Sequence, residues 1–302
     1  MTQARAWLID ASIYIFRAYF SLPDRWHTQD GMPLNAVYGY AGFLLDFIGS
    51  TGAKPYVAAA FDESLGTCFR NEILPGYKAS RVLPDPELAF QLNTCRALTE
   101  SLGIPCYGGS YYEADDYLAS LARICSESGV AVTVITRDKD LGQLLNKPAD
   151  SWWDFAADVQ LDAEAFHTRF GVTPKQFAQY QALVGDKIDD IPGVPGVGAK
   201  TAVALLQAFG DLDTLASRLG EVSALPVRGA ARVQASLQGH WDQIEVAVQL
   251  TRLATAIPDV DTMPAYAPSA AHLGAFADRI SELGLPASLV RRSERLAQET
   301  AV

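Results

Sequence analysis

Three apolar segments of the chain each stop at an aspartate, and this pattern restricts the fold more than any other feature. The segments ARAWLIDAS, KPYVAAAFDES and VAVTVITRDKD predict buried strands that end at Asp10, Asp62 and Asp138. Helical patterns separate them, in AVYGYAGFLLDFIGS, ELAFQLNTCRALTESLG and EADDYLASLARICSESG. Strands that alternate with helices predict a mostly parallel α/β sheet, which binds ligands at the carboxyl ends of its strands. The three aspartates should therefore lie at a binding edge.

Beyond about residue 160 the strand signal fades, and the sequence predicts helices separated by turns. We predict an α/β core over residues 1–175, a helical region over 176–262 and a C-terminal helical tail over 263–302. The tail begins with a Pro/Ala-rich spacer and ends in RRSERLAQ, which predicts a solvated end. With 302 residues, of which 49% are hydrophobic, the chain can bury a substantial core.

Acidic residues recur at spacings that place neighbours on one side. Glu113 and Asp116 are three apart at the start of a helical pattern with Asp115 between them, and helix capping is the simpler explanation for that group alone. The further pairs are Asp138 with Asp140 and Asp186 with Asp189. Any one pair could be a solvated surface feature, but all of them fall at one sheet edge or at the entrance to the helical region. We therefore predict a single acidic site.

Carboxylates gathered in this way need a cation, because two charges about 4 Å apart oppose each other by roughly 4 kcal/mol at an effective dielectric near 20. A site of carboxylates without His or Cys suits Mg²⁺ or Mn²⁺ better than zinc. Two such ions about 4 Å apart form an arrangement that cleaves phosphodiester bonds. The histidines all lie outside the acidic groups, at His27, His167, His240 and His272.

The net charge of −11 argues, by itself, against a nucleic-acid partner, since phosphate binding depends on Lys and Arg. A surplus of acid can instead collect where it holds divalent cations, so that net charge misstates the field that a ligand meets. The four cysteines lack C-x-x-C spacing, which argues against a zinc site and against a secreted disulfide framework. No apolar run reaches membrane-spanning length and no cleavage site follows the first one, so we expect a cytoplasmic protein.

The glycine-rich turn IPGVPGVGAKT follows the last acidic pair. A nucleotide-binding loop would need Lys directly after the second glycine of its motif, but Ala199 intervenes between Gly198 and Lys200. A tight turn between two helices fits better, with free N–H groups at the second helix and Lys200 forming a phosphate site. Such a hairpin grips a nucleic-acid backbone without reading its sequence, although a plain helix-helix turn remains nearly as good an interpretation.

Together these motifs resemble those of the bacterial and phage 5′-3′ exonucleases of the flap endonuclease family, which include the nuclease domain of bacterial DNA polymerase I. The resemblance runs from about residue 5 to about 262, in the order WLIDAS, FDES, FRNEILPGYKASR, YYEADDYLASLA, TRDKDLGQLL and GDKIDDIPGVPGVGAKTA. It implies a PIN-like α/β core, a helical arch over about 70–92 and a helix-two-turn-helix region. It also implies a two-metal nuclease that removes 5′ flaps and nucleotides from DNA, and RNA primers annealed to it, in replication and repair on the nucleoid.

The resemblance also implies roles for individual residues. Lys78 and Arg81 would contact the scissile phosphate with Asp115 beside them, and Val194 to Val197 would offer backbone carbonyls to a monovalent cation, often K⁺. Asp10, Asp62, Glu113 and Asp115 would belong to the first metal site. The second site and its surroundings would comprise Asp116, Asp138, Asp140, Asp186 and Asp189. Contacts with DNA would come from Arg17, Arg70, Tyr77, Lys78, Arg81, Gly193, Gly196, Gly198, Lys200 and Thr201, with Tyr77 stacking on the terminal base.

Two features depart from the family pattern or leave it open. Asp190 stands where relatives frequently have Asn, which adds a negative charge beside the phosphate grip. No polymerase follows, and the helical tail favours a free-standing, monomeric nuclease that a DNA polymerase or a sliding clamp could recruit. Two rival functions are a DNA-structure-binding protein of the same fold with weak catalysis, and a phosphatase with Asp10 as nucleophile. The phosphatase would need a second acid two residues later, where this chain has Ser12.

Overall fold

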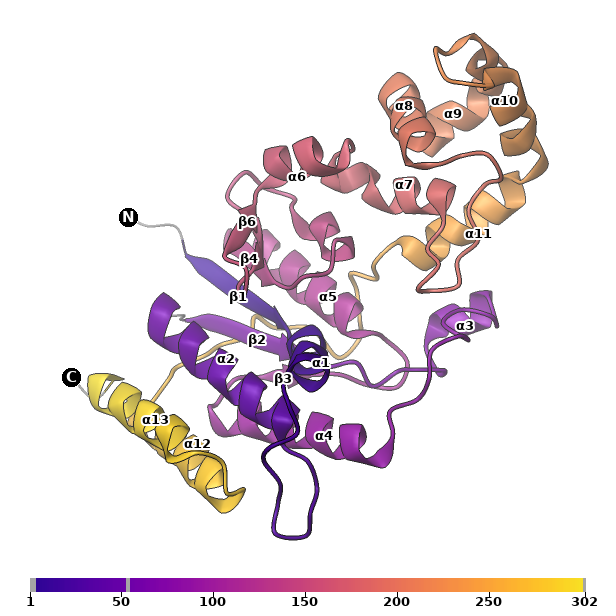
Figure 1. The fold of residues 1–302 in the computed structure, drawn as a ribbon. Helices are drawn as coiled ribbons and strands as arrows, with labels where there is room; N and C mark the ends of the chain where they lie inside the picture. The colour runs from indigo at the N-terminus through magenta and orange to yellow at the C-terminus, as the bar shows by residue number, and fades with distance from the viewer. Residues whose placement is uncertain (1–3, 53–54, 301–302) are drawn as a thin grey trace.

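The computed structural model describes residues 4–52 and 55–300, and its centre is a six-stranded sheet between two layers of helices (Figure 1). The strand order is β3-β2-β1-β4-β5-β6, and all neighbours are parallel except β5 and β6. The predicted mostly parallel sheet is therefore confirmed. Its strands are β1 (Arg5–Asp10), β2 (Tyr56–Ala60), β3 (Cys106–Tyr107), β4 (Ala131–Ile135), β5 (Ser151–Asp154) and β6 (Val159–Leu161).

The central strand β1 is buried on both faces, as its unbroken apolar sequence requires. Ala6 and Leu8 face one core, whereas Trp7 and Ile9 face the other. The first core lies against α5 (Ala114–Glu127) and continues into the helical region. The second lies against α1 (Ala11–Ser21), α2 (Asn35–Thr51) and α4 (Pro86–Ser101). Because the chain passes from β1 to β2 on one side and β4 lies on the other, the end of β1 is a switch point of the kind that binds ligands.

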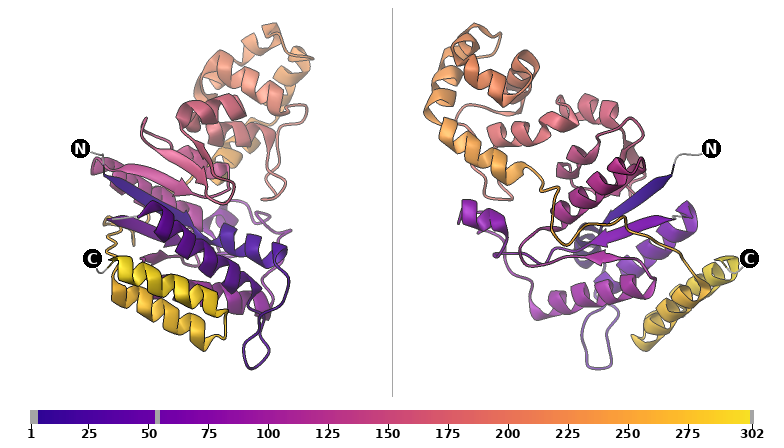
Figure 2. Two further views of the ribbon diagram at one scale, coloured as in Figure 1. Left: turned by 60° about the vertical axis from the view of Figure 1, so that its left-hand side comes forward. Right: turned by 180° about the vertical axis from the view of Figure 1, so that it is seen from behind.

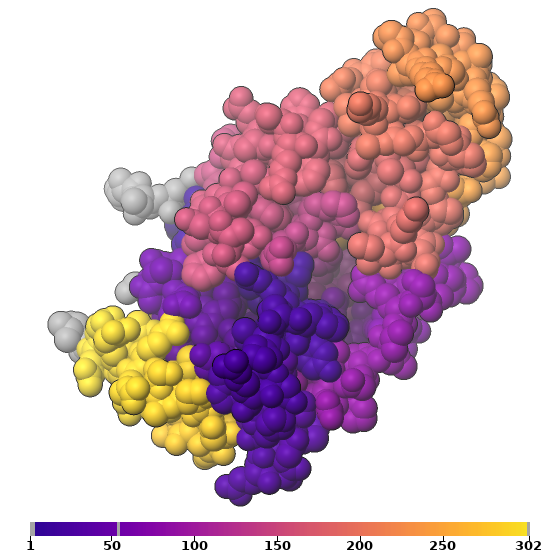
Figure 3. Space-filling model, viewed as in Figure 1, coloured from indigo at the N-terminus to yellow at the C-terminus, as the bar shows by residue number. Residues whose placement is uncertain are grey.

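The helical region stands to one side of the carboxyl ends of the strands (Figure 1). Its residues Leu183, Leu206 and Ile244 are buried in the same core as α5, so the two parts share one apolar interior. Figure 3 shows this region, coloured pink to orange, above the indigo N-terminal part. Its helices are α6 (Ala163–Phe170), α7 (Phe177–Val184), α8 (Ala199–Phe209), α9 (Leu212–Ser217), α10 (Ala230–Gly239) and α11 (Trp241–Thr251).

The C-terminal tail is not the solvated end that the sequence predicts. Helices α12 (Ala270–Glu282) and α13 (Ala287–Thr300) pack against each other and against α4 and α2, and the two views of Figure 2 show them along that side. Phe276, Ile280 and Leu289 are buried in the second core. The charged end RRSERLAQ is amphipathic, so its apolar face lies toward α2 while Arg291 and Arg295 are exposed and Arg292 pairs with Asp46 of α2.

Other element boundaries also differ from the prediction. Strand β2 ends at Ala60 and β4 at Ile135, so Asp62 and Asp138 lie in the loops just beyond the strands. The short strands β3, β5 and β6 carry too few residues for a periodic signal. The expected arch over about 70–92 is helical in α3 (Phe69–Ile73) and in the first part of α4, and turns connect the two helices. No helix in the described ranges is long and apolar enough to cross a membrane.

Candidate active site

A cavity of about 180 Å³ opens where the carboxyl ends of β1, β2 and β4 meet the start of α5 and the loop before α8. Five separate parts of the chain thus contribute acid to one space, as the sequence predicts. Lys78 and Arg81 also line this cavity, together with apolar groups such as Ile13 and Phe16. The carboxylates lining it are Asp10, Asp62, Glu113, Asp115, Asp138, Asp140 and Asp189.

Asp10 is both the last residue of β1 and the N-cap of α1, which fixes its carboxylate at the bottom of the cavity. One oxygen accepts a hydrogen bond from the Ile13 amide (3.3 Å) and the other from the Thr136 hydroxyl (2.8 Å). Burial, together with the negative charges of Asp62 and Asp138, raises the pKa of Asp10 to about 7, against the lowering effect of these hydrogen bonds. A carboxyl group here therefore holds a proton near neutral pH unless a cation replaces it.

The neighbouring carboxyls show the same excess of negative charge. Burial and the adjacent Asp140 raise the pKa of Asp138 to about 6. Burial and the charges of Asp138, Asp10 and Asp62 raise the pKa of Asp115 well above its usual value. Asp62 is held in place by the Ala114 amide, which donates to its Oδ1 at 2.9 Å. Groups that resist ionisation together in this way form a strong binding site for divalent cations.

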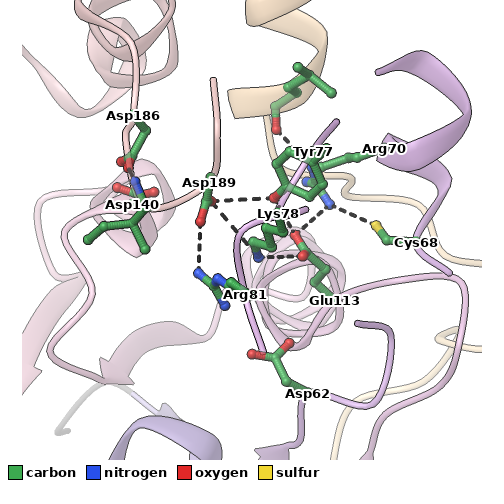
Figure 4. A network of polar contacts seen from close by, with 12 residues as sticks. Asp62, Cys68, Arg70, Tyr77, Lys78, Arg81, Glu113, Asp140, Asp186 and Asp189 are labelled. Carbon is green, nitrogen blue, oxygen red and sulfur yellow. Dashed lines mark hydrogen bonds and ion pairs between the residues drawn. The ribbon is translucent and has the colours of Figure 1, made fainter. Parts of the chain in front are cut away.

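Glu113 differs because positive groups surround it (Figure 4). Its Oε1 accepts a hydrogen bond from Lys78, and its Oε2 accepts from the Tyr77 hydroxyl (2.9 Å) and from Arg70 (3.0 Å). Burial alone would raise the pKa of Glu113, but Lys78 and Arg70 outweigh it and hold that pKa below its usual value. Glu113 therefore ionises readily without metal.

Arg70 does not occupy the surface position expected of a DNA contact. Its side chain is 1% exposed, and it donates to both carboxylate oxygens of Asp116, at 2.6 and 2.7 Å. It also donates to the carbonyls of Leu250 (2.8 Å) and Arg252 (3.2 Å) at the end of α11. Arg70 is thus an internal tie between α3, α5 and α11, and the expectation that it holds a phosphate is corrected.

Asp116 and Tyr77 are corrected for the same reason. Asp116 is fully buried, and its carboxylate also accepts hydrogen bonds from the amides of Glu113 (3.1 Å) and Ala254 (2.8 Å). It supports the cavity from behind and does not line it. Tyr77 is 3% exposed with its hydroxyl turned to Glu113, so its ring is not available to stack on a base.

The two cations expected at the phosphate do reach the cavity, and both are paired. Lys78 Nζ contacts Glu113 and lies 3.9 Å from Asp189 Oδ2. Arg81 Nη2 lies 2.7 Å from Asp189 Oδ1 (Figure 4). Asp189, from the loop before α8, therefore faces the segment that carries both basic residues. Lys78 and Arg81 thus line the cavity, and their contact with the scissile phosphate stays a prediction.

Asp186 lies beside the cavity and does not line it. Its carboxylate accepts a hydrogen bond from the Ile188 amide (2.8 Å) and pairs with Lys139 (3.2 Å), which also pairs with Asp140 (3.0 Å). The sequence reasoning missed Lys139, although its place between Asp138 and Asp140 in TRDKDL is a signal that it serves them. Ser12 and Thr136 were missed as well. The Ser12 hydroxyl accepts a hydrogen bond from the Asp62 amide, and the Thr136 hydroxyl donates one to the Asp10 carboxylate.

The glycine-rich turn has a structural part and an exposed part. A Cβ on Gly193 would lie 2.0 Å from the Val184 carbonyl oxygen, so close packing requires glycine here. The DNA contact expected of Gly193 stays a prediction. Gly196 has φ 82° and is exposed, as are Gly198 and Lys200. Gly198 is the N-cap of α8, so the first turn of that helix leaves amides free for an anion beside Lys200 and Thr201.

Arg17 lies away from the carboxylate cavity. It is exposed on α1 and lines a separate hollow of about 410 Å³ with Phe43, Phe155 and Arg292. It lies about two helical turns beyond Asp10, and Ile13 and Phe16 of the same helix line the carboxylate cavity instead. The DNA contact expected of Arg17 stays a prediction.

The donor set of the cavity fits hard cations such as Mg²⁺. It is made of carboxylates, and it includes no His or Cys. Within residues 4–52 and 55–300, no three of these groups converge as a preformed metal cage. This agrees with the behaviour of Mg²⁺, which keeps several waters and takes one or two carboxylates plus phosphate oxygens. In the protein alone, Lys78 pairs with Glu113 and Arg81 pairs with Asp189, two carboxylates that such an ion would otherwise contact.

Two family models match the chain. Residues 5–171 match the 5′-3′ exonuclease N-terminal resolvase-like domain, and residues 172–270 match the 5′-3′ exonuclease C-terminal SAM fold. DNA polymerase I of Rhizobium leguminosarum is 35% identical over 261 residues, which is 84% of this chain and 25% of the relative. DNA polymerase I of Pseudomonas aeruginosa is 36% identical over 258 residues, or 85% and 28% of the two chains. The chain thus spans about a quarter of the length of these relatives.

Solved structures with the same fold include a T5 5′-exonuclease with bound divalent metal ions (zinc), with a TM-score of 0.65 at 19% identity, covering 99% of this chain and 100% of that one. The catalytic core of Rad2 in complex with DNA substrate matches with a TM-score of 0.60 at 16% identity, covering 99% and 92%. Human GEN1 bound to Holliday junction DNA matches with a TM-score of 0.61 at 14% identity, covering 99% and 72%.

Proposed function

The chain belongs to the 5′-3′ exonuclease family, and from that premise we propose that it is a structure-dependent 5′-3′ exonuclease and 5′-flap endonuclease. Its reaction is the hydrolysis of phosphodiester bonds in DNA and in RNA primers annealed to DNA. Two Mg²⁺ or Mn²⁺ ions serve it, and when bound they supply the Lewis acidity that activates water and stabilises the leaving oxygen.

The observation that carries this proposal is a cavity lined by seven carboxylates together with the basic side chains of Arg70, Lys78 and Arg81. Burial and the neighbouring carboxylates raise the pKa values of Asp10 and Asp138, so their ionised forms are unfavourable in the protein alone. Cations are needed there, and a phosphodiester is a substrate that can bind between cations and the basic pair. A small polar cavity with these groups suits a phosphate much better than an apolar ligand.

Asp10, Asp62, Glu113 and Asp115 would hold one ion, and Asp138, Asp140, Asp186 and Asp189 would hold or surround the other. Asp116 takes no direct part, since Arg70 occupies both its oxygens. Lys78 and Arg81 would bind the non-bridging oxygens of the scissile phosphate and stabilise the charge that develops there. There the phosphate would compete with the carboxylate with which each is now paired.

The turn before α8 would bind the duplex away from the cleavage point. Gly196, Gly198, Lys200 and Thr201 present amides and one cation to a phosphate, and such contacts fix position without reading sequence. Backbone carbonyls of the turn from Val194 to Val197 would hold K⁺.

We propose further that the protein acts as a monomer in the cytoplasm at the nucleoid, where a DNA polymerase or sliding clamp could recruit it.

Cleavage of an end-labelled 5′-flapped duplex, with Mg²⁺ and then with EDTA, tests this function. We expect short 5′ products in Mg²⁺, no products in EDTA, and preference for the flap over a blunt duplex of the same sequence. Binding of the flap without cleavage in any divalent metal would instead support a DNA-structure-binding protein of this fold. A blunt duplex cut as fast as the flap would overturn the structure dependence.

A further inference from the structure

Two loops that are more than a hundred residues apart in sequence meet at the mouth of the cavity. We call residues 75–81 the rim segment and residues 185–191 the acidic loop. The Lys78 amide donates to the Asp189 carbonyl at 3.1 Å. The Ser80 amide donates to the Asp190 carboxylate, Oδ2, at 2.8 Å. Ser80 lies between Lys78 and Arg81 in the sequence, and these are the two basic residues that the proposed reaction needs.

The backbone at this junction has an unusual conformation on both sides. Lys78 has φ 53° and Asp190 has φ 56°, and the remaining non-glycine residue of the described chain with positive φ is Asp158 at 51°. Asp and Asn enter this region at little cost, whereas Lys does so only when its surroundings hold it there. The hydrogen bond from the Lys78 amide to Asp189 is one such restraint, and the Ser80 contact two residues later is another.

The acidic loop is itself well held. Asp186 and Ile191 exchange a pair of backbone hydrogen bonds, of 2.9 and 2.8 Å, that close its base. The Gly193 packing against Val184 fixes the chain immediately after it. By contrast, the chain after the rim segment is open, with Val82 90% and Leu83 67% exposed. The Ser80–Asp190 hydrogen bond therefore lies near the end of the rim segment, just before this exposed stretch, and it joins the rim segment to the acidic loop.

We propose that Asp190 is a positioning residue: by accepting the Ser80 amide, it holds the rim segment so that Lys78 and Arg81 face the carboxylate cavity. This inference rests on the proposed nuclease function for its kinetic effect, but its structural effect is independent of any activity. The acidic loop leads directly into the turn that would grip the duplex. Asp190 therefore sets the distance between this turn and the side chains of Lys78 and Arg81. Its negative charge accepts the hydrogen bond of the Ser80 amide.

Three variants separate the acceptor from the backbone conformation. Asp190→Gly keeps the left-handed backbone and removes the acceptor, whereas Asp190→Asn keeps both, because its amide oxygen can accept from Ser80. Asp158→Gly is the matched control: it removes an acceptor, here from the Trp153 indole at 3.2 Å, at a residue of the same type and φ that does not line the cavity.

The first measurement is trypsin cleavage after Lys78 and Arg81 in protein without DNA, followed by mass spectrometry. We expect cleavage several-fold faster in Asp190→Gly than in the wild type, with Asp190→Asn and Asp158→Gly unchanged. Equal rates in all four proteins would overturn the proposal. This readout stands even if the wild type shows no nuclease activity, so a failure of the proposed function is recognised separately.

The second measurement is single-turnover cleavage of a 5′-flapped duplex, with the Kd for the same DNA taken in Ca²⁺. In Asp190→Gly we expect the cleavage rate to fall about tenfold, since the lost bond has a charged acceptor, while the Kd changes less than about twofold. Asp190→Asn should restore the rate. An unchanged or faster rate in Asp190→Gly, or an Asn variant as slow as the Gly variant, would show that this contact does not position the basic pair.

Discussion

Replacing Asp10 with Asn should make the metal-free protein more stable while destroying its metal site. The carboxylate is 5% exposed and lies among other acids, so its ionised form is unfavourable without a cation. Asn keeps the N-cap bond, since its oxygen can accept from the Ile13 amide. Its Nδ2 would face the Thr136 hydroxyl, which has a lone pair free to accept because a hydroxyl accepts twice. The substitution therefore removes the charge with little change in shape.

The magnitude follows from the pKa of Asp10, which rises from 3.8 to about 7 on folding. Because this pKa is higher in the folded state, ionisation of Asp10 destabilises the folded protein. The effect on the free energy of unfolding is absent below about pH 4 and complete above about pH 7. The full difference corresponds to about 4 kcal/mol, and about 2 kcal/mol of it is present at pH 5. Because Asp62 and Asp138 share this repulsion and can relax, we expect Asp10→Asn to raise the free energy of unfolding by about 2 to 4 kcal/mol at pH 8 in EDTA.

The assay is urea denaturation in EDTA at pH 5 and pH 8, repeated at pH 8 with saturating Mg²⁺. In Mg²⁺ the wild type should become the more stable protein, because binding of the ion stabilises its folded state and Asp10→Asn has lost a ligand for that ion. Asp30→Asn, which removes an exposed charge outside the cavity, is the control and should change neither pH nor metal dependence. A variant less stable than the wild type at pH 8 in EDTA, or an equal gain at both pH values, would refute the electrostatic reasoning.

Three other substitutions test separate parts of the structure. Arg70→Met leaves two buried carboxylates without their shared cation, and we expect urea denaturation to show a loss of about 3 to 5 kcal/mol in the free energy of unfolding; a loss below 1 kcal/mol would contradict the buried tie. Gly193→Ala places a methyl 2.0 Å from the Val184 carbonyl and should lower the melting temperature clearly, whereas Gly239→Ala, with no atom within 4 Å, should not. Asp115→Ala should abolish cleavage of a 5′ flap in Mg²⁺ and leave flap binding in Ca²⁺ intact; unchanged cleavage would remove Asp115 from the site.

The sheet edge could be predicted because β1, β2 and β4, the three longer parallel strands, each carry their own signal. An apolar run that stops at an acid tells where a strand ends, and parallel pairing then brings Asp10, Asp62 and Asp138 to one side without knowledge of distant contacts. The direction of a side chain carries no such local signal. FRNEILPGYKASR alone gives no reason for Arg70 and Tyr77 to turn inward while Lys78 and Arg81 reach the cavity.

The reason is tertiary: carbonyls at the end of α11 and the carboxylate of Asp116 provide Arg70 with acceptors that solvent would otherwise supply. Those acceptors come from segments 46 and 180 residues away, so no local pattern could reveal them. The tail was misjudged for a similar reason. Its charged helix α13 has an apolar face, and whether such a face is buried depends on the presence of α2 beneath it.

The ion pairs at the cavity link metal binding to DNA binding. A phosphate would compete with Glu113 for Lys78 and with Asp189 for Arg81. Opening of either pair exposes a carboxylate to uncompensated negative charge, which strengthens the attraction of that carboxylate for a metal ion. Linkage makes this reciprocal, because a cation that binds Glu113 or Asp189 in turn releases the basic residue toward the substrate. We therefore expect Mg²⁺ to bind more tightly when a 5′-phosphate backbone is present, and the coupling should weaken in Lys78→Met because that variant has no pair to exchange. Equal Mg²⁺ affinity with and without DNA in the wild type, measured by calorimetry with uncleavable phosphorothioate DNA, would show that the pairs open independently of the metal.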